Sequence, residues 1–79
     1  MERQIDYKMC EPVLGFNTKQ WWVYASDLDV YVDPPKIVLD ELDKVVGHER
    51  QAQELFEIIG ENPSWLQDSD YWISEDIDI

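Results

Sequence analysis

Alternating apolar and polar positions dominate the first half of the chain and indicate strands. Three segments have this character or consist of residues that favour extended backbone: residues 3–10, 21–25 and 28–32. The last alternates most cleanly, because Val30 and Val32 fall on one side and Tyr31 on the other. Residues 11–20 and 26–27 contain the Pro, Gly, Asn and Asp typical of connections. We therefore predict a three-stranded antiparallel meander.

The spacing changes to a helical one after Pro35. Asp33 precedes two prolines, which predicts a helix start with Asp33 as the N-cap. Residues 36–47 and 48–60 then repeat apolar positions every three or four residues. The predicted apolar faces comprise Val38, Leu39, Leu42, Val45 and Val46 in the first helix, and Ala52, Leu55, Phe56 and Ile59 in the second. Asp40 and Lys44 are spaced for an ion pair on the outer side of the first helix.

The pattern weakens after Pro63. A turn around Trp65 and a short final strand over residues 71–73 fit it, and residues 74–79 are expected to be a disordered tail. The predicted fold class is therefore α+β. One two-layer domain spans residues 1–79, with both helices on one face of the antiparallel sheet.

Two adjacent tryptophans pose a packing problem for the second strand. Neighbouring side chains of a strand point to opposite faces, so Trp21 and Trp22 cannot both lie in the core. If Trp21 faces the helices, Trp22 and Tyr24 point outward beside Tyr31, and the opposite assignment exchanges them. An outward aromatic patch is costly unless something covers it. Three covers remain open: the C-terminal segment around Trp72, a second copy in a homodimer, or a different protein.

Charge narrows the range of partners. The 79 residues include 18 acidic and six basic side chains, for a formal net charge of −12. Such a balance repels nucleic acid and anionic membranes, so neither is an expected direct partner. A basic surface on another protein is the natural counterpart. Solubility is the simpler explanation of the same acidity.

Acidic residues recur at regular intervals in two places. They are Asp27, Asp29 and Asp33 along the third strand, and Glu54, Glu57 and Glu61 along the second helix. Carboxylates two residues apart on a strand lie about 6.6 Å from each other, given a rise of about 3.3 Å per residue. This distance is close to the spacing of successive phosphates on a nucleic-acid strand, which suggests nucleic-acid mimicry. Two solvated faces remain the alternative interpretation.

Catalytic chemistry has little support in the sequence. Cys10 is the only cysteine and His48 the only histidine, so no disulfide within the chain and no zinc site are expected. The acidic segments lack the glycine and the final glutamate of a calcium loop, and no phosphate-binding loop is present. We expect no enzyme activity and no cofactor. With no signal-peptide pattern and no membrane-length apolar run, a cytoplasmic location is predicted.

In length, charge, aromatic density and absence of a catalytic motif, the chain resembles the small acidic inhibitors encoded by bacteriophages and mobile elements, including anti-restriction and anti-CRISPR proteins. The resemblance implies an inhibitor that blocks a host defence or nucleic-acid-processing protein. An immunity protein or antitoxin against a basic nuclease, and a homo-oligomeric assembly subunit, are the alternatives. The candidate partner-binding residues, taken from the patterns above, are Trp22, Tyr24, Asp27, Asp29, Tyr31, Asp33, Glu54, Glu57 and Glu61.

Overall fold

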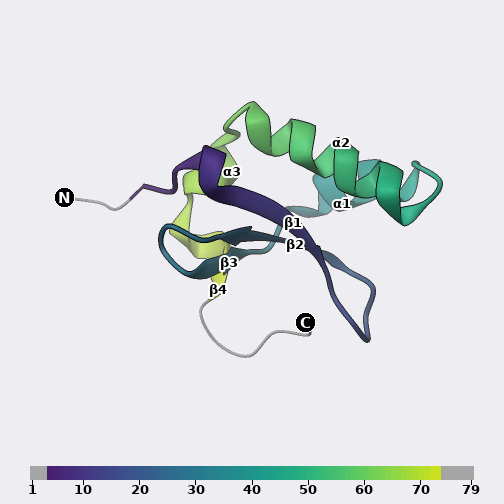
Figure 1. The fold of residues 1–79 in the computed structure, drawn as a ribbon, viewed down its shortest axis with the longest axis horizontal. Coiled ribbons are helices and arrows are strands. Elements are labelled where there is room, and N and C mark those ends of the chain that lie inside the picture. Colours follow the sequence, from purple (N-terminus) through teal and green to yellow (C-terminus); the bar gives the residue numbers. More distant parts are fainter. Residues whose placement is uncertain (1–3, 74–79) are drawn as a thin grey trace.

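The computed structural model describes residues 4–73, which form a four-stranded antiparallel sheet and three α-helices (Figure 1). The sheet order is β1-β2-β3-β4, with β1 at Cys10–Leu14, β2 at Trp21–Ala25, β3 at Val30–Val32 and β4 at Trp72–Ile73. The helices are α1 (Lys36–Asp43), α2 (His48–Gly60) and α3 (Ser64–Gln67), with short 3₁₀ turns η1 (Tyr7–Met9) and η2 (Ser69–Tyr71). The α+β prediction, the meander, the two helices and the short final strand are confirmed. The predicted tail lies outside the described residues.

The first strand begins later than the sequence predicted. Asp6 caps η1, because its Oδ1 accepts a hydrogen bond from the Lys8 N–H at 3.0 Å. The backbone therefore turns at Tyr7–Met9, and β1 begins only at Cys10. The predicted strand over residues 3–10 is wrong, and much of the predicted connection is strand.

Pro12 lies in β1 without disrupting the sheet, because β1 is an edge strand. Ser26 N–H donates to Met9 C=O at 3.2 Å, and Gly15 N–H donates to Gln20 C=O at 2.8 Å. Given the strand register, the odd-numbered residues of β1 direct their backbone groups toward β2. Pro12 therefore turns its missing N–H toward the open edge, where proline is tolerated. The missing donor also disfavours the addition of another strand there.

The turn before β3 is longer than predicted. Residues 26–29 form it, and Asp29 adopts a left-handed φ of 53°. Asp27 and Asp29 therefore do not lie on a strand, and the predicted row of strand carboxylates at two-residue steps is wrong. Asp33 does not cap α1 either: the N-cap is Pro35, without a side-chain hydrogen bond. Asp33 Oδ1 instead accepts a hydrogen bond from Gln20 Nε2 at 3.0 Å.

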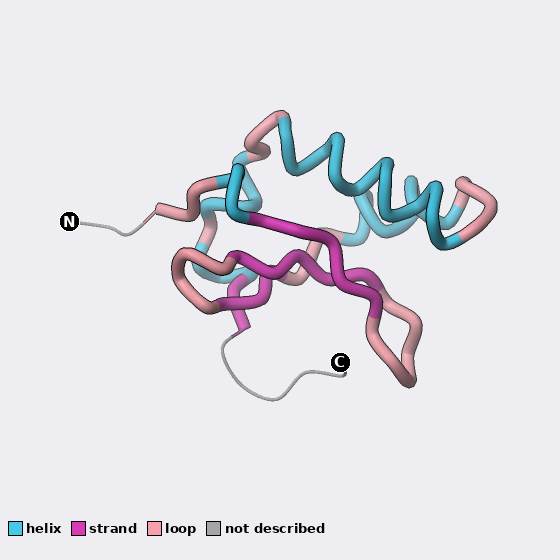
Figure 2. The backbone as a smooth tube through the Cα atoms, viewed as in Figure 1, coloured by secondary structure: helices cyan, strands magenta, loops and turns pink. Residues whose placement is uncertain are grey.

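The core lies between the sheet and the helices, which are on one side of it (Figures 1 and 2). Its buried residues are Ile5, Cys10, Trp21, Val23, Ala25, Val32, Val38, Leu42, Leu55, Ile59 and Leu66. The indole Nε1 of Trp21 donates to Gln51 Oε1 at 3.0 Å, and Gln51 Nε2 donates to Val45 C=O at 2.9 Å. One glutamine of α2 thus joins β2 to the segment after α1.

The predicted apolar faces of both helices were too wide. Val46 is 88% exposed and Phe56 is 58% exposed. The first helix ends at Asp43, so Val46 follows it in the connection to α2, where Gly47 adopts a left-handed φ of 94°. In α2, Leu55 and Ile59 face the core and Phe56 is rotated away from it. A helix in a domain this small buries only a narrow stripe.

Gln67 fastens the N-terminal segment to the domain. Its Oε1 accepts from the Ile5 N–H and its Nε2 donates to the Ile5 C=O, both at 2.8 Å. Nε2 also donates to Asn62 Oδ1 at 3.0 Å. One amide therefore acts on Ile5 as a strand partner would, and holds that buried side chain in the core.

Gln67→Glu is expected to destabilise the protein by about 2 kcal/mol, because it removes the donor and points a carboxylate oxygen at the Ile5 carbonyl. Urea denaturation followed by circular dichroism measures the loss. Gln53→Glu, which adds the same charge at an exposed position of α2, should shift stability by no more than about 0.5 kcal/mol. Acidification protonates the new carboxyl and restores a donor, so it should narrow the difference in stability between Gln67→Glu and the unmodified protein. Equal losses of stability in Gln67→Glu and Gln53→Glu would contradict the role of Gln67 in holding Ile5.

Candidate protein-binding surface

The sheet face opposite the helices has a defined set of side chains, which we call the outer face: Val13, Trp22, Tyr24, Tyr31 and Ile73. The strand register places Glu11, Tyr24, Tyr31 and Ile73 directly opposite one another on four successive strands. Val13 and Trp22 form a second pair beside this row. The rings of Tyr24 and Tyr31 are in contact, with centroids 4.8 Å apart and planes inclined by 41°.

No described helix packs on the outer face. Its five side chains are neither buried in the core nor packed against it, whereas α1, α2 and α3 each bury side chains on the opposite side of the sheet. Of the two assignments that the sequence left open, the observed one buries Trp21 in the core and directs Trp22 and Tyr24 outward. Trp72, one expected cover, packs on the core side and donates from Nε1 to Leu66 C=O at 3.0 Å. Within residues 4–73, the outer face therefore lacks a second layer.

Trp22 presents carbon surface. Its side chain is half-buried, and its Nε1 is buried without an acceptor among the described residues. The accessible part of the indole is therefore apolar, as suits an interface anchor.

Carboxylates border the aromatic row. Asp29 Oδ1 accepts a 2.7 Å hydrogen bond from the Tyr24 hydroxyl, which places this acid beside the outer face from the adjoining turn. That hydrogen bond, with smaller effects from desolvation and from the charges of Asp29, Tyr31 and Glu11, raises the pKa of Tyr24. Glu11 is exposed and lies across from Tyr24. The hydroxyl end of Tyr24 thus lies in a negative environment.

Asp33 forms another part of this border. The antiparallel ladder continues past β3, because Asp33 N–H donates to Tyr71 C=O at 2.8 Å. Alternation from the buried Val32 then places Asp33 on the outer side of the sheet. Desolvation raises the pKa of Asp33, and the hydrogen bond from Gln20 opposes this rise. A partly desolvated, ionised carboxylate at this position destabilises the free protein at neutral pH.

Asp33→Asn is expected to stabilise the protein at neutral pH. The asparagine oxygen keeps the acceptor for Gln20, and the desolvated charge is removed. Because the raised pKa means that the folded state binds this proton more tightly, the cost of ionisation appears as the pH rises through the folded-state pKa and is absent below the ordinary value of 3.8. Urea midpoints should therefore differ at neutral pH and converge in acid. As a control, Glu57→Gln removes one negative charge from an exposed position. If it raises the urea midpoint as much as Asp33→Asn does, the stabilisation comes from the lower net charge and not from the desolvation of Asp33.

The remaining candidate acids do not join this surface. Asp27 Oδ2 accepts from the Asp6 N–H at 2.7 Å and so positions the N-terminal segment. Glu54 and Glu57 lie on α2, which packs on the opposite side of the sheet, and Glu61 is the C-cap of that helix. The predicted residues thus separate into an outer-face group with Asp29 and Asp33, and a distant helical group. Glu11, Val13 and Ile73 were missed, the first two because Pro12 marked their segment as a connection.

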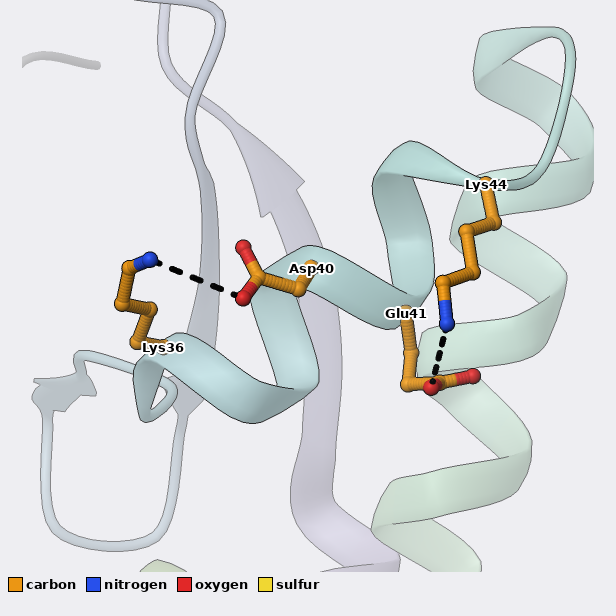
Figure 3. Close-up of polar contacts among 4 residues, drawn as sticks. All are labelled: Lys36, Asp40, Glu41 and Lys44. Atoms are coloured by element: carbon orange, nitrogen blue, oxygen red, sulfur yellow. Dashed lines mark hydrogen bonds and ion pairs between the residues drawn. The ribbon is translucent and has the colours of Figure 1, made fainter.

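Most described cations are engaged elsewhere. Lys36 pairs with Asp40 at 3.7 Å and Lys44 with Glu41 at 3.2 Å, both along α1 (Figure 3). The predicted pairing of Asp40 with Lys44 is therefore wrong. The amines of Lys8 and Lys19 lie 6.0 and 5.4 Å from the ring centroids of Tyr7 and Phe16. Among residues 4–73, no cation occupies a position of the outer face.

Two hollows lie along α2 rather than on the outer face. One of about 370 Å³ is polar and open, and is lined by Val45, Arg50, Gln53, Glu54 and Glu57. The other, of about 240 Å³, is apolar and is lined by Tyr7, Lys8, Phe56, Ile59 and Gly60. Neither contains a nucleophile paired with a base.

Other chemistry receives no support from the geometry. Cys10 is buried, and desolvation, with the charges of Asp27 and Asp6, raises its pKa to about 11, so the thiol is a poor nucleophile. The described residues contain no cluster of three or more metal-ligating side chains. Within the same part of the chain, no helix has the length and apolarity to cross a membrane.

Comparison with known proteins gives no relative: no family model, curated protein or solved structure matches the chain. The outer face is therefore the site on which a functional proposal rests.

Proposed function

We propose that this protein is a non-catalytic inhibitor that binds a basic surface of another protein through its outer face. The supporting observation is the aromatic row of Tyr24 and Tyr31, on which no helix of residues 4–73 packs, with Trp22 beside it and carboxylates at its border. Large aromatic side chains at the centre of a patch with a charged rim are typical of binding hot spots. A net charge of −12 would steer the chain toward a cationic partner.

The target class follows from this charge. Basic protein surfaces commonly bind phosphate backbones, so a protein that occupies one prevents nucleic acid from binding there. We propose a nucleic-acid-processing or defence protein of the host cell as the target. Direct mimicry of a phosphate row is not required, and the strand carboxylates do not form such a row. A second copy of this chain is a poorer partner, because pairing of two outer faces would bring two sets of bordering carboxylates into one interface, and no cation of residues 4–73 lies on that face to offset them.

The test has two steps. Tagged protein is used to capture partners from a nuclease-treated lysate of the native host, washed at low and then at high salt. A retained protein is then purified and assayed for binding to labelled DNA or RNA as the untagged chain is added. The proposal predicts displacement of the nucleic acid at stoichiometric amounts. A captured protein that binds nucleic acid equally well in the presence of the chain would refute inhibition, and the identity of the target separates a defence component from a nuclease toxin.

A further inference from the structure

The row of side chains across the sheet changes in character from acidic to aromatic to aliphatic. Glu11 on β1, Tyr24 on β2, Tyr31 on β3 and Ile73 on β4 are neighbours in register. Adjacent strands are about 4.8 Å apart, so the row extends about 14 Å from a carboxylate at the β1 edge to an aliphatic side chain at β4. The two aromatic rings occupy its centre.

The centre of the row favours a cation of a particular shape. The faces of the tyrosine rings carry negative charge, and Tyr24 and Tyr31 lie only 4.8 Å apart. Asp29, which accepts a 2.7 Å hydrogen bond from the Tyr24 hydroxyl, adds a carboxylate beside the rings. Glu11, which lies opposite Tyr24 on β1, adds a second. A planar guanidinium can stack on a ring and donate two parallel hydrogen bonds to a carboxylate. A lysine ammonium cannot do both.

From this placement we infer that the outer face is an arginine-binding surface, in which an arginine side chain of the partner stacks on Tyr24 and Tyr31 and pairs with Glu11 or Asp29. The inference rests on the proposed function, since it names the partner group that the same surface recognises. Trp22 and Ile73, on either side, would contact the apolar stem and the neighbouring apolar residues of the partner.

Two capped peptides test this directly: one of alternating glycine and arginine, and a glycine–lysine peptide of the same length and charge. Titration into ¹⁵N-labelled protein, followed by NMR, gives affinity and location together. The arginine peptide is expected to bind about threefold to tenfold tighter, with the largest shifts at Glu11, Tyr24, Asp29 and Tyr31. Equal affinities, or shifts centred on Glu54 and Glu57 of α2, would overturn the inference.

Two substitutions separate stacking from charge. Tyr24→Phe keeps the ring and loses the hydroxyl bond to Asp29, so the arginine preference should persist. Tyr24→Leu keeps an apolar strand residue and all the carboxylates, so both peptides should then bind equally and weakly. Circular dichroism verifies that each variant is folded. A preference that survives in Tyr24→Leu would contradict stacking, and the shift map of the unmodified protein decides the matter if that variant does not fold.

The outcomes of this test and of the capture experiment are independent. A preference for the arginine peptide without displacement of nucleic acid would support the arginine-binding surface and refute the proposed inhibition. Displacement of nucleic acid by a protein that binds both peptides equally would support the proposed inhibition and refute the arginine-binding surface.

Discussion

Leu55→Ala is expected to cost about 3 kcal/mol of folding stability, more than the loss expected for Gln67→Glu. Leu55 is fully buried, and the removal of a buried leucine side chain loses transfer free energy and leaves a cavity. A domain of 79 residues has a total stability on the order of 4–12 kcal/mol. The variant should therefore unfold at a much lower urea concentration, as measured by circular dichroism.

Phe56→Ala is the matched control for this substitution. Phe56 is the next residue of α2 and has the larger side chain, but it is 58% exposed, so its loss should cost less than about 1 kcal/mol. The opposite order of costs would mean that α2 presents a different face to the sheet from the one described.

Reversal of the charge at Glu11 and Asp29 is expected to weaken binding of the captured partner by about thirtyfold or more, because new lysines at the border of the outer face would repel a basic surface. Both positions are exposed. Asp29 has a left-handed backbone, which a lysine also adopts in this protein at Lys19, with a φ of 60°, and circular dichroism verifies that the double variant is folded. Biolayer interferometry with the purified partner measures the change.

Glu54→Lys with Glu57→Lys is the control for this double variant. Each pair of reversals changes the net charge from −12 to −8, since each reversal replaces one negative charge by one positive charge. The helical pair should alter affinity by only a few-fold, through weaker steering of the encounter. If both pairs weaken binding to the same extent, net charge rather than the outer face determines affinity.

The sequence predicted two elements, β2 and α2, with the bounds that the structure shows. WWVYA and the helix over residues 48–60 have the predicted bounds, because β-branched and aromatic residues in one and helical spacing ending at Gly60 in the other agree with their tertiary surroundings. Alternation predicted that Trp21 and Trp22 point to opposite faces, and the structure shows which of them lies in the core.

Two of the errors arise from side-chain hydrogen bonds, one between near neighbours in the sequence and one across the fold. Asp6 turns the backbone at η1 and shortens the first strand. Asp33 accepts a hydrogen bond from Gln20, and α1 begins without a side-chain N-cap. A single sequence does not reveal that Pro12 lies at a sheet edge, which is why Glu11 and Val13 were not recognised as strand residues on the side of the sheet opposite the helices.

Site-specific photo-crosslinking tests the outer face as the binding surface most directly. Benzoyl-phenylalanine would replace Tyr31 in one variant and the exposed Phe56 of α2 in another, with irradiation in native host lysate and analysis of the adducts by mass spectrometry. If the partner binds the outer face, the Tyr31 position should crosslink to a basic, nucleic-acid-binding protein and the Phe56 position should not. Crosslinks from Phe56 alone, or from Tyr31 only to a second copy of the chain, would contradict binding through this face.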